Sequence, residues 1–137
     1  MKNQLGRRVI FFIFLSCAGL AGCASQPFKT GTRWVGAYEC RQGVTDLELT
    51  VVDAQQSNVK AIFHFRHDPS RVEGSFYMYG LYNAKTRELK LYPGDWINRP
   101  PGYITVGMRG RVFSDPLRFE GVITTEGCKD FSVRLEK

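Results

Sequence analysis

The sequence predicts an all-β domain: an antiparallel meander of about eight strands that closes as a small barrel or folds over as a sandwich. Apolar residues recur at every second position along most of the chain from Trp34 onward, whereas no window of a dozen residues has the period of an amphipathic helix. The composition agrees, because 10 Phe, 6 Tyr, 2 Trp and 14 Gly favour strands and tight turns.

The individual strands follow from where this alternation starts and stops. Turn residues such as Gln42-Gly43, Asp68-Pro69-Ser70 and Glu126-Gly127 separate the alternating stretches. We expect strands at residues 34–40, 47–51, 59–66, 76–82, 89–91, 104–112, 117–123 and 131–135. Closure into a barrel would remove the open edges that such a meander otherwise leaves. Its bulky aromatic residues are compatible with a filled core or a lined cavity, and we favour the filled core.

The first 22 residues have the parts of an export signal. A basic start with Arg7-Arg8 is followed by an apolar run over residues 9–15 and by small residues before a cleavage point. As far as Gly22 the apolar stretch is about 14 residues, shorter than the roughly 20 that span a bilayer as a helix. A short transmembrane anchor is therefore the weaker alternative.

The end of this segment, Leu20-Ala21-Gly22-Cys23, resembles the lipobox of bacterial lipoproteins at all four positions. The resemblance implies cleavage before Cys23, a diacylglycerol on its thiol and a further acyl chain, such as palmitate, on the new amine. Several acyl chains together make such an anchor effectively permanent. Similar lipoproteins without Asp after the Cys usually reach the outer membrane, so we expect the periplasmic face of that membrane. Residues 23–32 are then a tether and residues 33–137 the barrel domain.

Removal of the signal also changes the cysteine count. Cys17 is lost and Cys23 is acylated, which leaves Cys40 and Cys128. Two thiols in a domain exported to an oxidising compartment predict one disulfide. Cys40 ends the first expected strand and Cys128 precedes the last. In an even-stranded up-and-down barrel these strands pair antiparallel, so the disulfide would staple the seam where the barrel closes.

The charge of the chain argues against a nucleic-acid partner. Loss of Lys2, Arg7 and Arg8 with the signal lowers the formal net charge from +6 to +3. This mild bias permits contact with anionic headgroups or cell-wall polymer. The sequence has no dense Lys/Arg stripe with interleaved aromatics, and we expect no nucleic-acid binding.

The sequence offers little that could carry catalysis. Its two histidines, His64 and His67, have an odd spacing that places them on opposite faces of a strand, and no third metal ligand is evident. The carboxylates are dispersed, and the common hydrolase, metalloprotease and phosphate-loop motifs are absent from the sequence. We expect no catalytic residues, no metal and no cofactor, and hence a non-enzymatic protein.

The longest expected connection, residues 92–103, is the candidate binding loop. It concentrates Trp96, Arg99 and Tyr103, residue types that are frequent at binding hot spots, and three prolines restrict it. In the alternative interpretation, Trp96 and Ile97 fold back to plug an open end of the barrel. The two interpretations are compatible.

The opening of the first strand, Trp34 to Gly43 (WVGAYECRQG), resembles that of small secreted bacterial β-domains, and the architecture is similar to avidin-like and lipocalin-like barrels. These observations predict a membrane-anchored envelope lipoprotein whose β-barrel binds an envelope protein or a cell-wall component. One alternative is a calycin-like carrier of a small molecule or lipid, which requires an open cavity. Another is an inhibitor or immunity lipoprotein against an envelope-attacking hydrolase, although a positive charge opposes steering toward basic targets.

Overall fold

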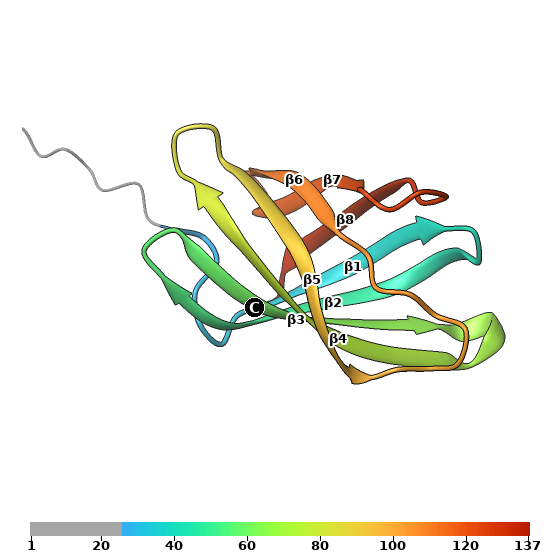
Figure 1. Cartoon of the computed structure of the whole chain (residues 1–137). Coiled ribbons are helices and arrows are strands. Elements are labelled where there is room, and N and C mark those ends of the chain that lie inside the picture. Colours follow the sequence, from blue (N-terminus) through green and yellow to red (C-terminus); the bar gives the residue numbers. More distant parts are fainter. Residues whose placement is uncertain (1–25) are drawn as a thin grey trace, which may run out of the picture.

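The computed structural model describes residues 26–137, so the expected signal segment and Cys23 lie outside the described residues. Eight strands form one closed antiparallel barrel in sequence order (Figure 1). They are β1 (Arg33–Cys40), β2 (Gly43–Gln55), β3 (Asn58–His67), β4 (Val72–Asn83), β5 (Glu88–Asn98), β6 (Met108–Phe113), β7 (Arg118–Ile123) and β8 (Asp130–Leu135), with one 3-10 turn, η1 (Asp68–Ser70), between β3 and β4. The predicted eight-stranded meander is confirmed, and it closes as a barrel. Residues 26–137 contain no helix with the length and apolar character needed to cross a bilayer.

The core lies inside the barrel, where the strands place alternate side chains. In β3, for example, Val59, Ala61, Phe63 and Phe65 are buried, and the residues between them are partly exposed. Aromatic rings dominate this interior: the largest fully buried side chains are those of Trp34, Phe28, Phe63, Phe65, Phe76 and Phe119.

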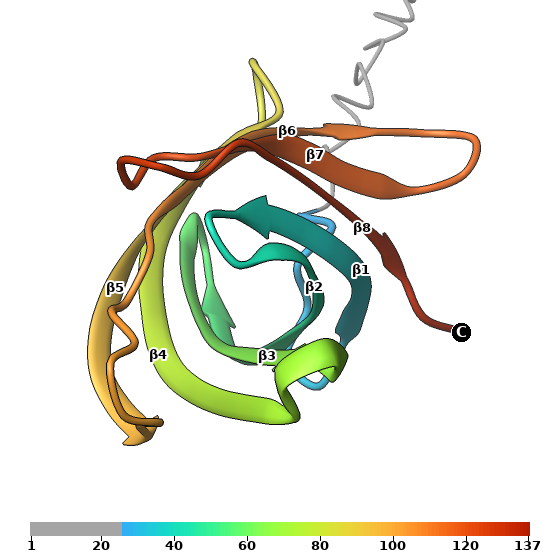
Figure 2. The same cartoon turned by 90° about the vertical axis from the view of Figure 1, so that its right-hand side faces the viewer.

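The antiparallel meander gathers its turns at two ends. We call one the closed end, which holds residues 26–32, the β2–β3, β4–β5 and β6–β7 turns and the C-terminal residues 136–137. The other, the open end, holds the β1–β2 turn, η1 and the two connections at residues 99–107 and 124–129. Figure 2 looks into the barrel from the side of the open end.

The closed end is filled by the segment that precedes β1. Phe28 is completely buried, with its ring centroid 4.8 Å from that of Trp34 and 5.3 Å from that of Phe119. The segment is tied to β2 because the amide of Gly31 donates to the carbonyl of Val51 at 2.8 Å. The expected tether over residues 23–32 is therefore wrong for residues 26–32. Most residues of this segment are small or polar, but its one large apolar side chain, Phe28, enters the barrel.

The expected connection at residues 92–103 also differs. β5 continues to Asn98, because β4 is long enough to pair with it that far, and register shifts opposite Phe76 obscure the alternation in the sequence. β6 begins at Met108, so residues 104–107, which were expected in a strand, lie outside it; Ile104 is 64% exposed. β5 pairs with β6 only over residues 88–91. The barrel wall beside residues 92–98 is consequently completed by a connection rather than by a strand.

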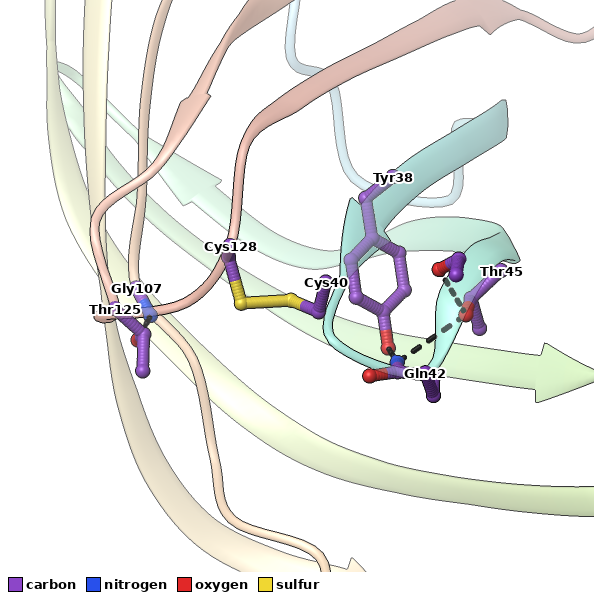
Figure 3. The surroundings of a disulfide bond; sticks show 8 residues. Tyr38, Cys40, Gln42, Thr45, Gly107, Thr125 and Cys128 are labelled. Carbon is purple, nitrogen blue, oxygen red and sulfur yellow. Dashed lines mark hydrogen bonds between the residues drawn. A yellow bond between two sulfur atoms is a disulfide. The ribbon is translucent and has the colours of Figure 1, made fainter.

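The seam between β1 and β8 is closed as the cysteines predict. The two strands pair from Trp34 opposite Leu135 to Tyr38 opposite Phe131, and the disulfide joins Cys40 to Cys128 at the open end of this seam (Figure 3). The strands approach closely at Gly36, where any side chain would collide with the carbonyl of Ser132.

Candidate binding cavity

A cavity of about 570 Å³ occupies the open end of the barrel. Its walls come from the inner faces of β1, β3 and β4, from the β1–β2 turn and from the two open-end connections. They comprise Tyr38, Cys40, Arg41, Gln42, Phe63, Phe65, Phe76, Gly102, Tyr103, Ile104, Val106, Thr125, Glu126, Gly127 and Cys128. The volume lies in the range of small-molecule sites. The barrel thus has a filled core over most of its length and a hollow at one end.

The floor of the cavity is aromatic. Phe63 and Phe76 stack with their centroids 4.8 Å apart, and Tyr38 meets the edge of Phe63 at 5.3 Å. Tyr103 stacks on Phe65 at 5.3 Å and carries this surface up toward the mouth. Phe63, Phe65, Phe76 and Tyr38 are each at most 5% exposed, so the partly exposed Tyr103 is the aromatic ring that this surface presents at the mouth.

Tyr38 adds a polar group to this floor. Its side chain is 5% exposed, and burial raises the pKa of the phenol, so the hydroxyl is protonated at neutral pH. The amide nitrogen of Gln42 donates to the hydroxyl oxygen at 3.4 Å and to the hydroxyl of Thr45 at 3.2 Å (Figure 3). Thr45, which lies directly opposite Tyr38 in the β1–β2 pairing, is also a hydrogen-bond partner of this hydroxyl. Tyr38, Gln42 and Thr45 therefore form one hydrogen-bonded group in the cavity wall.

The mouth carries one charge of each sign. Arg41, in the β1–β2 turn, places its side chain against Gly127 beside the disulfide, and Glu126 is the residue before that glycine. Both side chains are exposed, and neither forms an ion pair with another residue in the described part of the chain. They are therefore available to a ligand at the mouth.

The two open-end connections, residues 99–107 and 124–129, form the other wall and are hydrogen-bonded to each other. The amide of Thr124 donates to the carbonyl of Gly107 at 2.9 Å. The amide of Gly107 donates to the hydroxyl of Thr125 at 3.3 Å, a bond that Figure 3 shows. Two hydrogen bonds thus replace the strand ladder here. This wall is the less firmly bonded side of the cavity.

Of the three residues in the predicted binding loop, Tyr103 lines the cavity. Trp96 lies on β5 and packs its ring edge-on against Phe76 at 5.2 Å. Arg99 holds its guanidinium 5.8 Å from the Trp96 ring and donates to the carbonyl of Tyr103 at 3.4 Å. Trp96 therefore helps to fill the barrel as the plug interpretation expects, while Ile97 is 48% exposed and does not.

Sequence reasoning missed the polar side of the cavity, namely Tyr38, Arg41 and Gln42. The available signal was their position: they flank Cys40, which was already predicted to lie where the first strand ends. A strand end next to the barrel seam brings its turn residues to the barrel mouth.

The two histidines lie on opposite faces of β3, as their spacing predicts. His64 points outward, with Nε2 3.8 Å from a carboxylate oxygen of Glu73. His67 is buried, with Nδ1 2.7 Å from the hydroxyl of Ser70. Among the described residues, no three His, Cys, Asp or Glu side chains are grouped so that they could hold a metal ion.

Comparison with known proteins adds no family. No protein-family model matches the sequence, and no curated protein matches it.

Proposed function

We propose that this protein is an envelope lipoprotein, anchored through Cys23, whose barrel binds a small molecule without transforming it. The observation that carries the proposal is the contrast between an aromatic cavity at the open end and a barrel interior that is filled elsewhere. A binding role without catalysis suits the lining, which has no histidine and has Glu126 as its one carboxylate.

The anchor would set the orientation of the barrel. Gln26 lies at the closed end, where its side-chain amide donates to the carbonyl of Gln56 at 2.6 Å. Cys23 precedes Gln26 by three residues, a span of about 11 Å at most. A lipid on Cys23 would therefore hold the closed end near the membrane and direct the cavity mouth away from it.

The cavity favours the small-molecule alternative over a protein-binding loop. Trp96 packs against Phe76 inside the barrel and Arg99 lies near the Trp96 ring, whereas the cavity mouth presents the partly exposed Tyr103 and the exposed Ile104. A ligand of suitable size would bury most of its surface there, as small-molecule sites do.

Native mass spectrometry of the full chain tests the binding role. The protein is purified from membranes in lipid nanodiscs, and small molecules that co-purify are detected. Val106→Phe places a larger side chain in the cavity, whereas Val122→Phe makes the same change on the outer wall and serves as the control. We expect a bound mass in the wild type and in Val122→Phe, reduced at least tenfold in Val106→Phe. No bound mass, or equal amounts in all three proteins, would overturn the proposal.

The intact mass of the same preparation tests the anchor. The wild type should lack residues 1–22 and carry the diacylglycerol and acyl chain, and Cys23→Ser should retain the signal and carry no lipid. An unmodified wild-type chain would contradict the proposed anchoring.

A further inference from the structure

The outer wall of the barrel carries exposed apolar side chains on β3, β4 and β5, which lie side by side (Figure 1). Tyr79 is 45% exposed, Leu81 61% and Tyr92 60%. The register gathers them, because Tyr79 lies directly opposite Tyr92. Together with Lys60 and Lys90 they line one hollow in the outer wall, and we call these five residues the tyrosine face. Exposed apolar groups gathered in this way mark a surface that meets a partner.

The lysines give the tyrosine face a positive charge. Lys60 holds its Nζ 4.7 Å from the centre of the Tyr77 ring, and Lys90 lies opposite Arg109 of β6. Among residues 26–137, none of these three cations forms an ion pair. Asp53 is the one carboxylate among the described residues that line the hollow. Tyrosines and basic side chains are the residue types found where membrane headgroups meet the acyl chains.

The tyrosine face adjoins the proposed site of lipid attachment. Gln26 and Leu81 line the same hollow at the closed end. Cys23 precedes Gln26 by three residues, a span of about 11 Å at most. A membrane that holds acyl chains on Cys23 is therefore within reach of Leu81 and the residues beside it.

A second exposed apolar surface, on β1, β6, β7 and β8, has a different charge. There Phe113 and Val122 share a hollow with the carboxylates of Glu39, Glu120 and Asp130. Two of these carboxylates are in ion pairs with neighbouring cations. Within the described part of the chain, no lysine or arginine lines this hollow. Negatively charged headgroups would therefore be attracted to the tyrosine face and not to this surface.

We propose that the tyrosine face rests on the headgroups of an anionic phospholipid membrane, an inference that rests on the proposed anchoring through Cys23. Tyr79, Leu81 and Tyr92 enter the interface, and the two lysines lie against phosphate groups. An anchor at one residue limits the distance between barrel and membrane, and the tyrosine face determines which side of the barrel meets the lipid. The face lies in the half of the wall nearer the closed end, so the cavity mouth still points away from the membrane.

Quenching of tryptophan fluorescence by brominated phosphatidylcholine tests which side meets the lipid. Tyr92→Trp adds a tryptophan to the tyrosine face. Val35→Trp is the matched control, at a partly exposed position of β1 that is also toward the closed end but on the opposite side of the barrel. The full-length proteins are placed in nanodiscs of phosphatidylglycerol with brominated or unbrominated phosphatidylcholine, and the wild-type emission of Trp34 and Trp96 is subtracted. We expect bromination to lower the added emission at least twofold in Tyr92→Trp and to leave that of Val35→Trp unchanged.

Charge reversal tests the contribution of the headgroups. Lys60→Glu and Lys90→Glu, added together to Tyr92→Trp, should remove most of the quenching, because phosphatidylglycerol repels the new carboxylates. Arg71→Glu with Arg134→Glu makes the same charge change at exposed arginines outside the tyrosine face and should leave the quenching unchanged.

The outcomes separate this inference from the proposed function, because the intact mass reports the anchor independently. In a lipidated protein, equal quenching of the two added tryptophans, quenching of neither, or quenching that survives reversal of both lysines overturns the membrane contact alone. If soluble peptidoglycan fragments, and not brominated lipid, changed the emission of Tyr92→Trp, the face would bind cell-wall polymer and the membrane contact would again fall alone. An unmodified Cys23 together with no quenching overturns both proposals.

Discussion

The two ends of the barrel differ in how the space between the strands is filled. At the closed end, Phe28 enters the interior and packs on Trp34, Tyr82 and Phe119. At the open end, the interior is hollow, and residues 99–107 complete the wall outside the strand ladder. The difference indicates that side-chain packing stabilises the closed end, whereas the open end is less tightly packed and contains the cavity.

The seam shows the same contrast. At its closed end, Arg33 donates to Glu48 and forms an ion pair with Glu136 at 2.6 Å, beside well-packed aromatic rings. At its open end, the Cys40–Cys128 disulfide stands beside the cavity. A covalent link holds the two strands together where side-chain packing is missing.

Removal of the disulfide should have the largest effect on stability. The variant with both Cys40→Ala and Cys128→Ala frees a loop that spans 88 positions. The chain-entropy model gives a loss on the order of 4–5 kcal/mol in the free energy of unfolding, measured by urea denaturation. Hydrogen exchange should rise first in residues 124–129 and at the start of β8. Faster exchange that begins instead at the closed end would contradict the assignment of the disulfide to the weaker end.

Phe28→Ala should be the next largest change. The ring is completely buried against three aromatic side chains, so its loss should lower the free energy of unfolding by about 3–5 kcal/mol. Tyr103→Ala is the matched open-end variant. Because Tyr103 is partly exposed beside a cavity, its cost should be about 1 kcal/mol. Equal costs for the two variants would remove the distinction between the ends.

The strands and their closure could be predicted from the sequence, but the full length of β5 could not. Alternation over short stretches predicted the strands, and the positions of Cys40 and Cys128 predicted which strands meet at the seam. Alternation did not reveal that β5 extends to Asn98, because register shifts within its pairing to β4 break the period that carries the signal.

The plug and the cavity depend on long-range packing. Phe28 stands alone among small and polar residues, and its burial depends on an opening that eight distant strands create. The cavity likewise depends on how far residues 99–107 and 124–129 reach across the open end. Of the polar residues around it, Tyr38 lies within the expected strand at residues 34–40, but the local sequence does not show which groups its hydroxyl meets.

Tyr38→Phe should alter the alkaline limb of the stability curve. Burial raises the pKa of Tyr38 above its ordinary value of 10.0, so the folded state holds the phenol proton more tightly than the unfolded chain does. Its contribution is fully present below about pH 10 and is lost as the pH rises through the folded-state pKa. Urea midpoints measured from pH 8 to 11.5 (roughly the range in which this group responds) should fall less steeply in the variant. Identical slopes would show that the hydroxyl is not buried at the cavity wall.

Glu48→Gln should have the smallest effect, and it tests an ion pair between β1 and β2 near the closed end. Hydrogen bonding from Arg33 holds the pKa of Glu48 below its ordinary value of 4.5. A lowered pKa contributes stability above about pH 4.5 that is lost as the pH falls through the folded-state value. Both side chains are substantially exposed, so water and salt screen the pair and its contribution is small. The variant should therefore match the wild type near pH 3 and be slightly less stable at pH 7, with a difference that shrinks in 1 M salt. A large difference at pH 7 that persists in salt would mean that the ion pair, rather than Phe28 and its neighbours, holds the closed end together.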